Sequence, residues 1–163
     1  MDAVTLLTDG SVNTRTKVGY GAYLALSDHG LSLDELSRQV KVRRFSPTSS
    51  TKLELQTLLW ALGDLQASGR PLTVITDSQN IIGLPGRRSR LEQNNYRSKN
   101  NSRLNHYELY QEFYSRMDQL DCELIKVQGH QVSKQKNDLD RLFSLVDRAS
   151  RSALREDARR STR

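Results

Sequence analysis

The stretch TKLELQTLLWALGDLQASGRPLTVITD, residues 51–77, decides the fold because it combines one helix and one strand in direct succession. Leucines recur every three or four residues from Leu55 to Leu65, which is the period of an amphipathic α-helix. Gly69-Arg70-Pro71 then ends the helix, and the apolar run at 72–76 is typical of a short buried strand. A helix that leads into a buried strand predicts a layered α/β fold.

The segments on both sides extend this pattern. Upstream, three segments that are apolar or alternate between polar and apolar residues favour strands: 4–9, 20–26 and 38–45. Downstream, four elements are expected: a short helix from Ser78 that is broken at Pro85-Gly86, a helix near 106–120, a strand at 122–128 and a long amphipathic helix at the C-terminus. Antiparallel strands followed by alternating helices and strands predict one mixed sheet with helices on its faces.

The composition predicts one folded, water-soluble domain. A chain of 163 residues has room for a single hydrophobic core, expected over residues 1–157, followed by an Arg-rich tail over 158–163. The last residues, REDARRSTR, are expected to be frayed.

The chain's one cysteine, Cys122, cannot form an internal disulfide, and neither a signal peptide nor a membrane span is recognisable. We therefore expect a cytoplasmic monomer with no membrane association and no obligate protein partner.

Positive charge is concentrated in two segments. The chain has a formal net charge of +6. Residues 86–104 contain six Lys and Arg against one Glu, and residues 148–163 contain six Arg against one Glu and one Asp. Such a layout suits a polyanionic partner, because Lys and Arg that neutralise phosphates release counterions. A solubilising surface is the alternative.

Three acidic residues lie at positions where a buried or edge-of-sheet carboxylate would cost free energy unless it has a role. Asp9 ends the first strand, Asp77 ends the strand at 72–76, and Glu54 lies in the first turn of the helix between them. If these two strands are neighbours, both aspartates emerge side by side at carboxyl ends, where open α/β sheets place their sites. Clustered carboxylates repel one another unless a cation neutralises them, and oxygen ligands favour Mg²⁺ or Mn²⁺ over zinc.

Each of these acids also has a purely structural interpretation. Asp9-Gly10-Ser11 could be a turn, Asp77-Ser78 a helix N-cap, and the segment from Thr51 to Glu54 a capping box.

Six short blocks occur in order along the chain: TDGS at 8–11, GYGAYL at 19–24, STKLEL at 50–55, TDSQ at 76–79, KVQGH at 126–130 and VDRASRSA at 146–153. In this order and approximate spacing they resemble the signature blocks of type 1 ribonuclease H, over essentially the whole chain. The resemblance implies a ribonuclease H-like α/β fold, with a five-stranded mixed sheet of three antiparallel and then parallel strands and helices on both faces. It also implies the catalytic and metal-binding carboxylates Asp9, Glu54, Asp77 and Asp147, with His130 on a loop.

The activity implied by the resemblance is that of an endoribonuclease that hydrolyses the RNA strand of RNA·DNA hybrids with two Mg²⁺ ions, Mn²⁺ being the alternative. The ends left would be 5′-phosphate and 3′-hydroxyl. Asp9 would bridge both ions, Asp147 would complete the site that activates water, and Glu54 with Asp77 would complete the site that stabilises the leaving oxygen. His130 would assist proton transfer or product release, unless it is an ordinary solvated loop histidine.

Substrate contacts are implied at polar and basic positions: Gly10, Ser11, Ser50, Thr51, Ser78, Gln79, Arg87, Arg88 and Arg90. Hybrid selectivity requires reading the 2′-hydroxyl, and short polar groups near the carboxylates suit that task. The stretch 86–104 resembles the family's substrate-binding protrusion, in which Arg and Lys would hold DNA phosphates. It lacks the tryptophans common in bacterial relatives and offers Tyr96 for stacking.

The fourth carboxylate has two candidates. Asp140 lies ten residues after His130, the separation expected in the family, whereas the residues around Asp147 reproduce the family's pattern of small residues and arginine. We favour Asp147, because the residues that follow Asp140, Phe143 and Leu145, are bulky where the pattern requires small ones.

Two other functions compete with the nuclease. A hybrid-binding module that is catalytically weak or inactive would keep the fold and the basic segments but could lose the acids, all of which are present. A proofreading-type exonuclease would need an Asp-x-Glu pair on the first strand, where the chain has Asp9-Gly10-Ser11.

Overall fold

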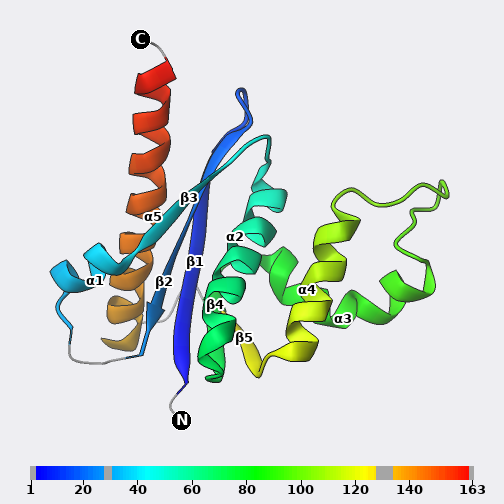
Figure 1. Ribbon diagram of the computed structural model, residues 1–163, viewed down its shortest axis with the longest axis horizontal. Helices are drawn as coiled ribbons and strands as arrows, with labels where there is room; N and C mark the ends of the chain where they lie inside the picture. Colours follow the sequence, from blue (N-terminus) through cyan, green and yellow to red (C-terminus); the bar gives the residue numbers. More distant parts are fainter. Residues whose placement is uncertain (1–2, 28–30, 128–133, 162–163) are drawn as a thin grey trace.

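A five-stranded mixed sheet forms the centre of the protein (Figure 1). The computed structural model describes residues 3–27, 31–127 and 134–161. The strands are β1 (Val4–Asn13), β2 (Val18–Leu26), β3 (Lys41–Phe45), β4 (Leu72–Thr76) and β5 (Cys122–Lys126). Their order is β3-β2-β1-β4-β5; β1, β2 and β3 are antiparallel, and β4 and β5 run parallel to β1. The predicted sheet is confirmed.

Helices cover both faces of this sheet. They are α1 (Leu33–Gln39), α2 (Ser50–Leu65), the 3₁₀ helix η1 (Gln66–Ser68), α3 (Gln79–Gln93), α4 (Tyr107–Gln119) and α5 (Lys134–Ser161). None of the helices in the described ranges has the length and apolar character needed to cross a membrane. In Figure 1, α5 and α1 lie on one side of the strands, and α2, α3 and α4 lie on the other. The arrangement is therefore the expected α/β one.

Each face of the sheet has its own hydrophobic core. On the α2 side the predicted leucine stripe is buried, and it packs against strand residues such as Leu6 and Val74. On the α5 side, Leu7 packs with Val146. Because neighbouring residues of a strand point to opposite faces, the adjacent pair Leu6 and Leu7 serves both cores. Strand β1 is therefore buried from two sides, which fixes the position of Asp9, two residues beyond Leu7. The prediction that Asp9 ends the first strand is wrong, because β1 continues to Asn13 and pairs with β2 over this length.

Two glycines let α2 come close to the sheet. Gly10 in β1 and Gly21 in β2 are partners across the antiparallel ladder. A Cβ atom on Gly10 would lie 2.8 Å from Leu53 Cδ2, and one on Gly21 would clash with Thr57 Oγ1. Because these helix residues fill the space that side chains would need, the first turns of α2 approach β1. This close approach brings Glu54 toward the carboxyl half of β1.

The strand predicted over 38–45 is shorter than expected because an unpredicted helix precedes it. Helix α1 begins after Ser32, whose hydroxyl accepts a hydrogen bond from the Glu35 N–H at 3.2 Å. The helix has a single buried residue, Leu36. One buried residue in seven gives no recognisable period, which is why the sequence pattern did not indicate a helix.

The helix break predicted at Pro85-Gly86 is wrong, since α3 runs through Pro85 to Gln93. A proline inside a helix removes one backbone hydrogen bond and is costly. In the same turns, Arg87 Nη2 donates to the Asn80 carbonyl oxygen at 3.0 Å and to Asn80 Oδ1 at 2.8 Å, which adds hydrogen bonds to this part of the helix. The first part of the basic stretch 86–104 is therefore helical.

The prediction that the C-terminal residues are frayed is also wrong, because α5 continues to Ser161. Asp157, near the end of this helix, accepts hydrogen bonds from the Tyr20 hydroxyl at 2.7 Å and from Arg44 Nε at 2.8 Å. These contacts join the last turns of α5 to β2 and β3. Residues 158–161, expected to belong to a separate tail, form the final turn of the helix.

Candidate active site

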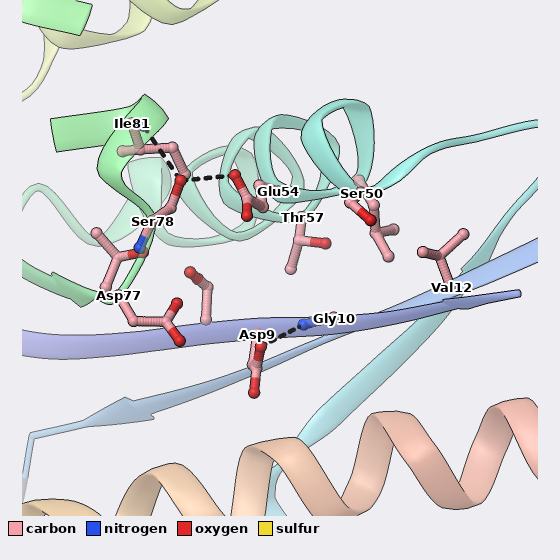
Figure 2. A pocket seen from close by; sticks show the side chains of 12 residues that line it. Asp9, Gly10, Val12, Ser50, Glu54, Thr57, Asp77, Ser78 and Ile81 are labelled. Carbon is pink, nitrogen blue, oxygen red and sulfur yellow. Dashed lines mark hydrogen bonds between the residues drawn. The ribbon is translucent and has the colours of Figure 1, made fainter. Parts of the chain in front are cut away.

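Asp9 and Asp77 meet because β1 and β4 are parallel neighbours. Leu7 is paired with Ile75, so two residues further on Asp9 lies beside the point where Asp77 leaves β4. Both line a cleft of about 210 Å³ that also includes Glu54 from α2. Figure 2 shows Asp9 on β1, Asp77 just before α3 and Glu54 on α2, around one space. The three carboxylates that the sequence indicated are brought together.

The pKa of Asp9 is raised from its usual 3.8 to about 6. Burial is the main cause, and the negative charges of Asp77 and Asp147, together with a hydrogen bond to Asp147, raise it further. The Gly10 N–H, which donates to Asp9 Oδ1 at 2.8 Å, acts in the opposite direction. A half-buried carboxyl group surrounded by other carboxylates is a position that favours a bound cation.

A hydrogen bond from Ser78 fixes Glu54. Ser78 Oγ donates to Glu54 Oε2 at 2.6 Å and accepts from the Ile81 N–H at 3.2 Å, so it caps α3 and holds the carboxylate (Figure 2). Ser78 is only 5% exposed, which keeps water away from this contact. The N-cap of α2 is Ser49 and not Thr51, so Glu54 takes no part in a capping box and its carboxylate faces the cleft.

Two aspartates of α5 lie on the other side of Asp9 and Asp77. Asp140 and Asp147 line a second depression together with this pair. Asp147 raises the pKa of Asp9 through its charge and a hydrogen bond. It also forms an ion pair with Arg151, whose Nε lies 3.0 Å from Asp147 Oδ1. Asp140 is exposed and also lines a groove between α1 and α5.

The groups that could bind a cation here are carboxylate oxygens. Within residues 3–27, 31–127 and 134–161, no three His, Cys, Asp or Glu side chains are grouped tightly enough to hold a metal ion as they stand. Mutual repulsion separates unneutralised carboxylates, and Glu54 is tied to Ser78. A bound cation would therefore have to draw these side chains together. His130, the predicted loop histidine, lies outside the described residues.

Four of the predicted substrate contacts lie at or beside the cleft. Gly10, Ser50 and Ser78 line it, while Thr51 is exposed in the first turn of α2. Gly10 serves the packing of α2, since Leu53 occupies the space that a side chain at this position would need. The hydroxyl of Ser78 is already used by Glu54 and by the cap of α3.

Two further polar residues of the predicted set are paired with other side chains. The hydroxyl of Ser11 lies 2.9 Å from that of Ser150, which joins β1 to α5. Gln79 Oε1 accepts a hydrogen bond from Lys126 Nζ, which joins the start of α3 to the end of β5. Both contacts connect elements that surround the carboxylates.

Arg88, predicted to bind phosphates, joins α3 to α4 in the structure. Its Nη1 and Nη2 atoms donate to Asp118 at 2.6 and 2.8 Å, and its Nε donates to Glu92 at 2.8 Å. The guanidinium also lies 5.1 Å from the centre of the Tyr114 ring. Every edge of this guanidinium therefore has a protein partner.

The neighbouring basic residues are placed differently. Arg87 is bound to Asn80, and with the exposed Arg90 it lines a basic depression formed by α3 and the following loop. Tyr96, expected to stack on a DNA strand, is 6% exposed and belongs to the core on the α2 side. The stacking prediction is wrong, because a buried ring cannot pack against a nucleotide.

Two residues of the site were not predicted as part of it. Thr57 lines the cleft, and its hydroxyl is buried without a hydrogen-bond partner among the described residues. Arg151 lines the second depression beside Asp147. Each follows a predicted carboxylate by one helical turn, and this spacing is the signal that could have identified them.

Comparison with known proteins adds the following. The family model described as RNase H matches residues 1–148. The structure of the foamy viral protease-reverse transcriptase in complex with dsDNA aligns with a TM-score of 0.63 and 12% identity, over 88% of this chain and 94% of that one. The same viral protein in complex with RNA/DNA hybrid aligns with a TM-score of 0.62 and 12% identity, over 86% of this chain and 19% of that one.

These two likenesses confirm the predicted ribonuclease H-like fold. The family model covers most of the chain, including all five strands and the positions of Asp9, Glu54, Asp77 and Asp147. The chain therefore belongs to the RNase H family.

Proposed function

We propose that the protein is an endonuclease that hydrolyses the RNA strand of RNA·DNA hybrids. Membership of the RNase H family makes it a nuclease. The observation that carries the finer proposal is the cluster of Asp9, Asp77 and Asp147, with Glu54 on the opposite rim of the cleft. Carboxylates that crowd one position, with no cysteine or histidine lining either depression in the part of the chain that the structure describes, suit metal-assisted hydrolysis of a phosphodiester.

Divalent metal ions fit this donor set. The side chains that would hold two Mg²⁺ ions, or Mn²⁺ in their place, are Asp9, Glu54, Asp77 and Asp147, all hard oxygen donors. When bound, such ions lower the pKa of water and stabilise charge on phosphoryl oxygens. The raised pKa of Asp9 supports this role, because a bound cation would offset the burial and the repulsion that raise it.

The chain's own residues orient these carboxylates. Ser78 holds one oxygen of Glu54, and the Gly10 N–H holds one oxygen of Asp9, so both carboxylates are oriented by the fold. Burial of Ser78 excludes water from its contact with Glu54. His130 is proposed to assist proton transfer during cleavage, which would leave 5′-phosphate and 3′-hydroxyl ends.

A nucleic-acid duplex is the proposed substrate. The two foamy viral structures were solved with dsDNA and with an RNA/DNA hybrid, and both share this fold. Ser50 and Thr51, beside the cleft, are short polar side chains that could recognise a 2′-hydroxyl. Arg87 and Arg90 line a basic depression that suits phosphates of the DNA strand.

One observation favours a second function, a hybrid-binding module with weak or no catalysis. Asp147 is paired with Arg151, so a protein cation already neutralises part of the charge that a metal would otherwise balance. This ion pair is exposed, however, and exposed pairs contribute little energy. A divalent ion would compete with it readily.

The test uses labelled RNA·DNA, RNA·RNA and DNA·DNA duplexes, each incubated with the protein in Mg²⁺, in Mn²⁺ and in EDTA. We expect cleavage of the RNA strand of the hybrid alone, only with a divalent ion, and a 5′-phosphate on the products. Hybrid binding without cleavage in either metal would favour the binding module. Cleavage that persists in EDTA would contradict the metal-dependent mechanism.

A further inference from the structure

The C-terminal half of α5 carries exposed arginines on its outer face. Arg148, Arg151, Arg155 and Arg159, here called the arginine stripe, are spaced three and four residues apart and therefore share one side of the helix. The acidic residues in this half after Asp147 are Glu156 and Asp157, and Asp157 turns inward to β2 and β3. The outward face is therefore strongly positive.

Contacts on the inner face hold this half of the helix in place. Ser150 is fully buried and lies within hydrogen-bond distance of Ser11. Further along, Asp157 binds the Tyr20 hydroxyl and Arg44. Because the backbone that carries the arginine stripe is fixed, a ligand that binds there would have only the side chains to order, which limits the entropic cost of binding.

The arginine stripe begins at the proposed active site. Arg151 lines the same depression as Asp9, Asp77 and Asp147. From Asp147 to Arg159 the helix advances by about 18 Å at 1.5 Å per residue. Phosphates of one strand are spaced about 3.4 Å apart along a duplex, so this length matches about five nucleotides.

The two basic regions of the molecule lie on either side of the carboxylates. In Figure 1, α5 lies on one side of β1, while α3 and the loop that follows it lie on the other. The last turns of α5 lie at the end of the molecule where β1 turns into β2. A duplex whose scissile phosphate reaches Asp9 could therefore contact positive charge on both sides of the cut.

Two pairings that the stripe makes within the protein are weak enough to be exchanged. Arg155 Nη2 lies 3.4 Å from Ser152 Oγ, and Arg159 Nη1 lies 3.1 Å from Glu156 Oε1. The side chain of Arg159 is 72% exposed, and an exposed ion pair of this kind contributes little energy. Phosphate oxygens could replace these partners at small cost.

We infer that the arginine stripe binds the phosphate backbone of the duplex on the flank of the cut, up to about five nucleotides from the scissile phosphate. This inference rests on the proposed function. It assigns a role to the second basic segment of the chain, which the carboxylate site and the basic depression at α3 leave unexplained.

The experiment measures hybrid binding in EDTA, so that no cleavage interferes, as a function of salt concentration. The test variant is Arg155→Gln/Arg159→Gln, which leaves Arg151 and its contact with Asp147 intact. The matched control is Arg38→Gln/Lys41→Gln, which removes the same charge from exposed positions on α1 and β3. Arg155→Lys/Arg159→Lys keeps the charge and controls for folding.

With a hybrid of about 24 base pairs, we expect the test variant to lower the slope of log Kd against log salt by about one to two. The control pair and the Lys variant should keep the wild-type slope.

Three results would overturn the inference. The first is an unchanged slope on the long hybrid in a test variant that is folded, while wild-type protein still cleaves hybrids; this result would leave the proposed function standing. The second is loss of binding to anionic phospholipid vesicles with no loss of hybrid binding, which would identify a lipid surface as the partner. The third is a wild-type protein that neither binds nor cleaves hybrids, which would overturn the proposed function as well.

Discussion

The two sides of the candidate active site are built differently. On the α2 side, Glu54 is held by the buried hydroxyl of Ser78 at 2.6 Å. On the α5 side, Asp147 is 36% exposed and forms an ion pair with Arg151, itself 66% exposed. One carboxylate is thus fixed by the fold, whereas the other has a partner that it can exchange.

This difference indicates how the site could accept a cation. Asp9 lies between the two sides, and its pKa is raised by burial and by Asp77 and Asp147. A side chain at the surface of α5 can shift toward a cation at little cost, because an exposed pair contributes little energy. We therefore expect α2 and β1 to provide the rigid part of the site and α5 the adjustable part.

The largest effect should come from the α5 side, where two aspartates compete. We expect Asp147→Asn to reduce hybrid cleavage to background at saturating Mg²⁺, because an amide cannot supply the charge that a metal site needs. Asp140→Asn, the matched control on the same helix, should stay within a few-fold of wild type. The reverse pattern, with both variants folded by circular dichroism, would make Asp140 the fourth carboxylate.

A smaller effect is expected on the fixed side. Ser78→Ala removes the partner of Glu54, and loss of such an orienting group typically lowers activity by about 10- to 100-fold. The matched control is Ser32→Ala, which also removes a helix N-cap, that of α1. Ser32 does not line the cleft, so this variant should leave the rate unchanged. Ser78→Thr, which keeps a hydroxyl, should restore much of the rate. Equal activity of Ser78→Ala and Ser32→Ala in a Mg²⁺ titration would show that Ser78 acts only as a helix cap.

The smallest effect concerns stability and tests the central residue, Asp9. Its pKa is about 6 in the folded protein and about 3.8 in the unfolded chain, so folding favours the protonated form. Without metal, Asp9 is neutral in the folded protein at pH 4. As the pH rises from 4 to 6, the free energy of unfolding falls, because Asp9 ionises more readily in the unfolded chain than in the folded protein. Above pH 6 the cost of ionising Asp9 in the folded protein reaches up to about 3 kcal/mol, at 1.36 kcal/mol for each pKa unit.

Asp9→Asn removes this cost because the amide carries no charge. In EDTA, urea unfolding should therefore show the variant to be more stable than wild type at pH 7.5, with the gain gone at pH 4. A variant that is less stable than wild type at pH 7.5 would mean that Asp9 is not strained by its neighbours.

Much of the fold and the rigid half of the site could be predicted from the sequence. The strand at 72–76 and the leucine period of α2 are local patterns, and one assumption, that β1 and β4 are neighbours, is enough to bring Asp9 and Asp77 together. Glu54 then follows from its place in the first turns of α2. These predictions depend on backbone periodicity, which a single sequence displays directly.

The parts that could not be predicted depend on tertiary partners. Arg88 looks like a phosphate ligand in a basic stretch, yet Asp118, thirty residues away in α4, occupies its guanidinium. Tyr96 lies in a polar stretch and is nonetheless buried. Helix α3 continues through Pro85, where the local rule indicates a break. For Arg88 and Tyr96, contacts distant in sequence outweigh the local pattern, and no alternation or spacing indicates them.

The most direct test of the carboxylate site is the rate of Mg²⁺-dependent hybrid cleavage by Asp77→Asn, compared with wild type at equal protein concentration and after its fold is verified. Asp77 is exposed at the end of β4, so the substitution should leave the core intact. We expect folded protein with cleavage at background level over the whole range of Mg²⁺ concentrations. Cleavage within a few-fold of wild type would contradict the assignment of this cluster as the site that hydrolyses the RNA strand.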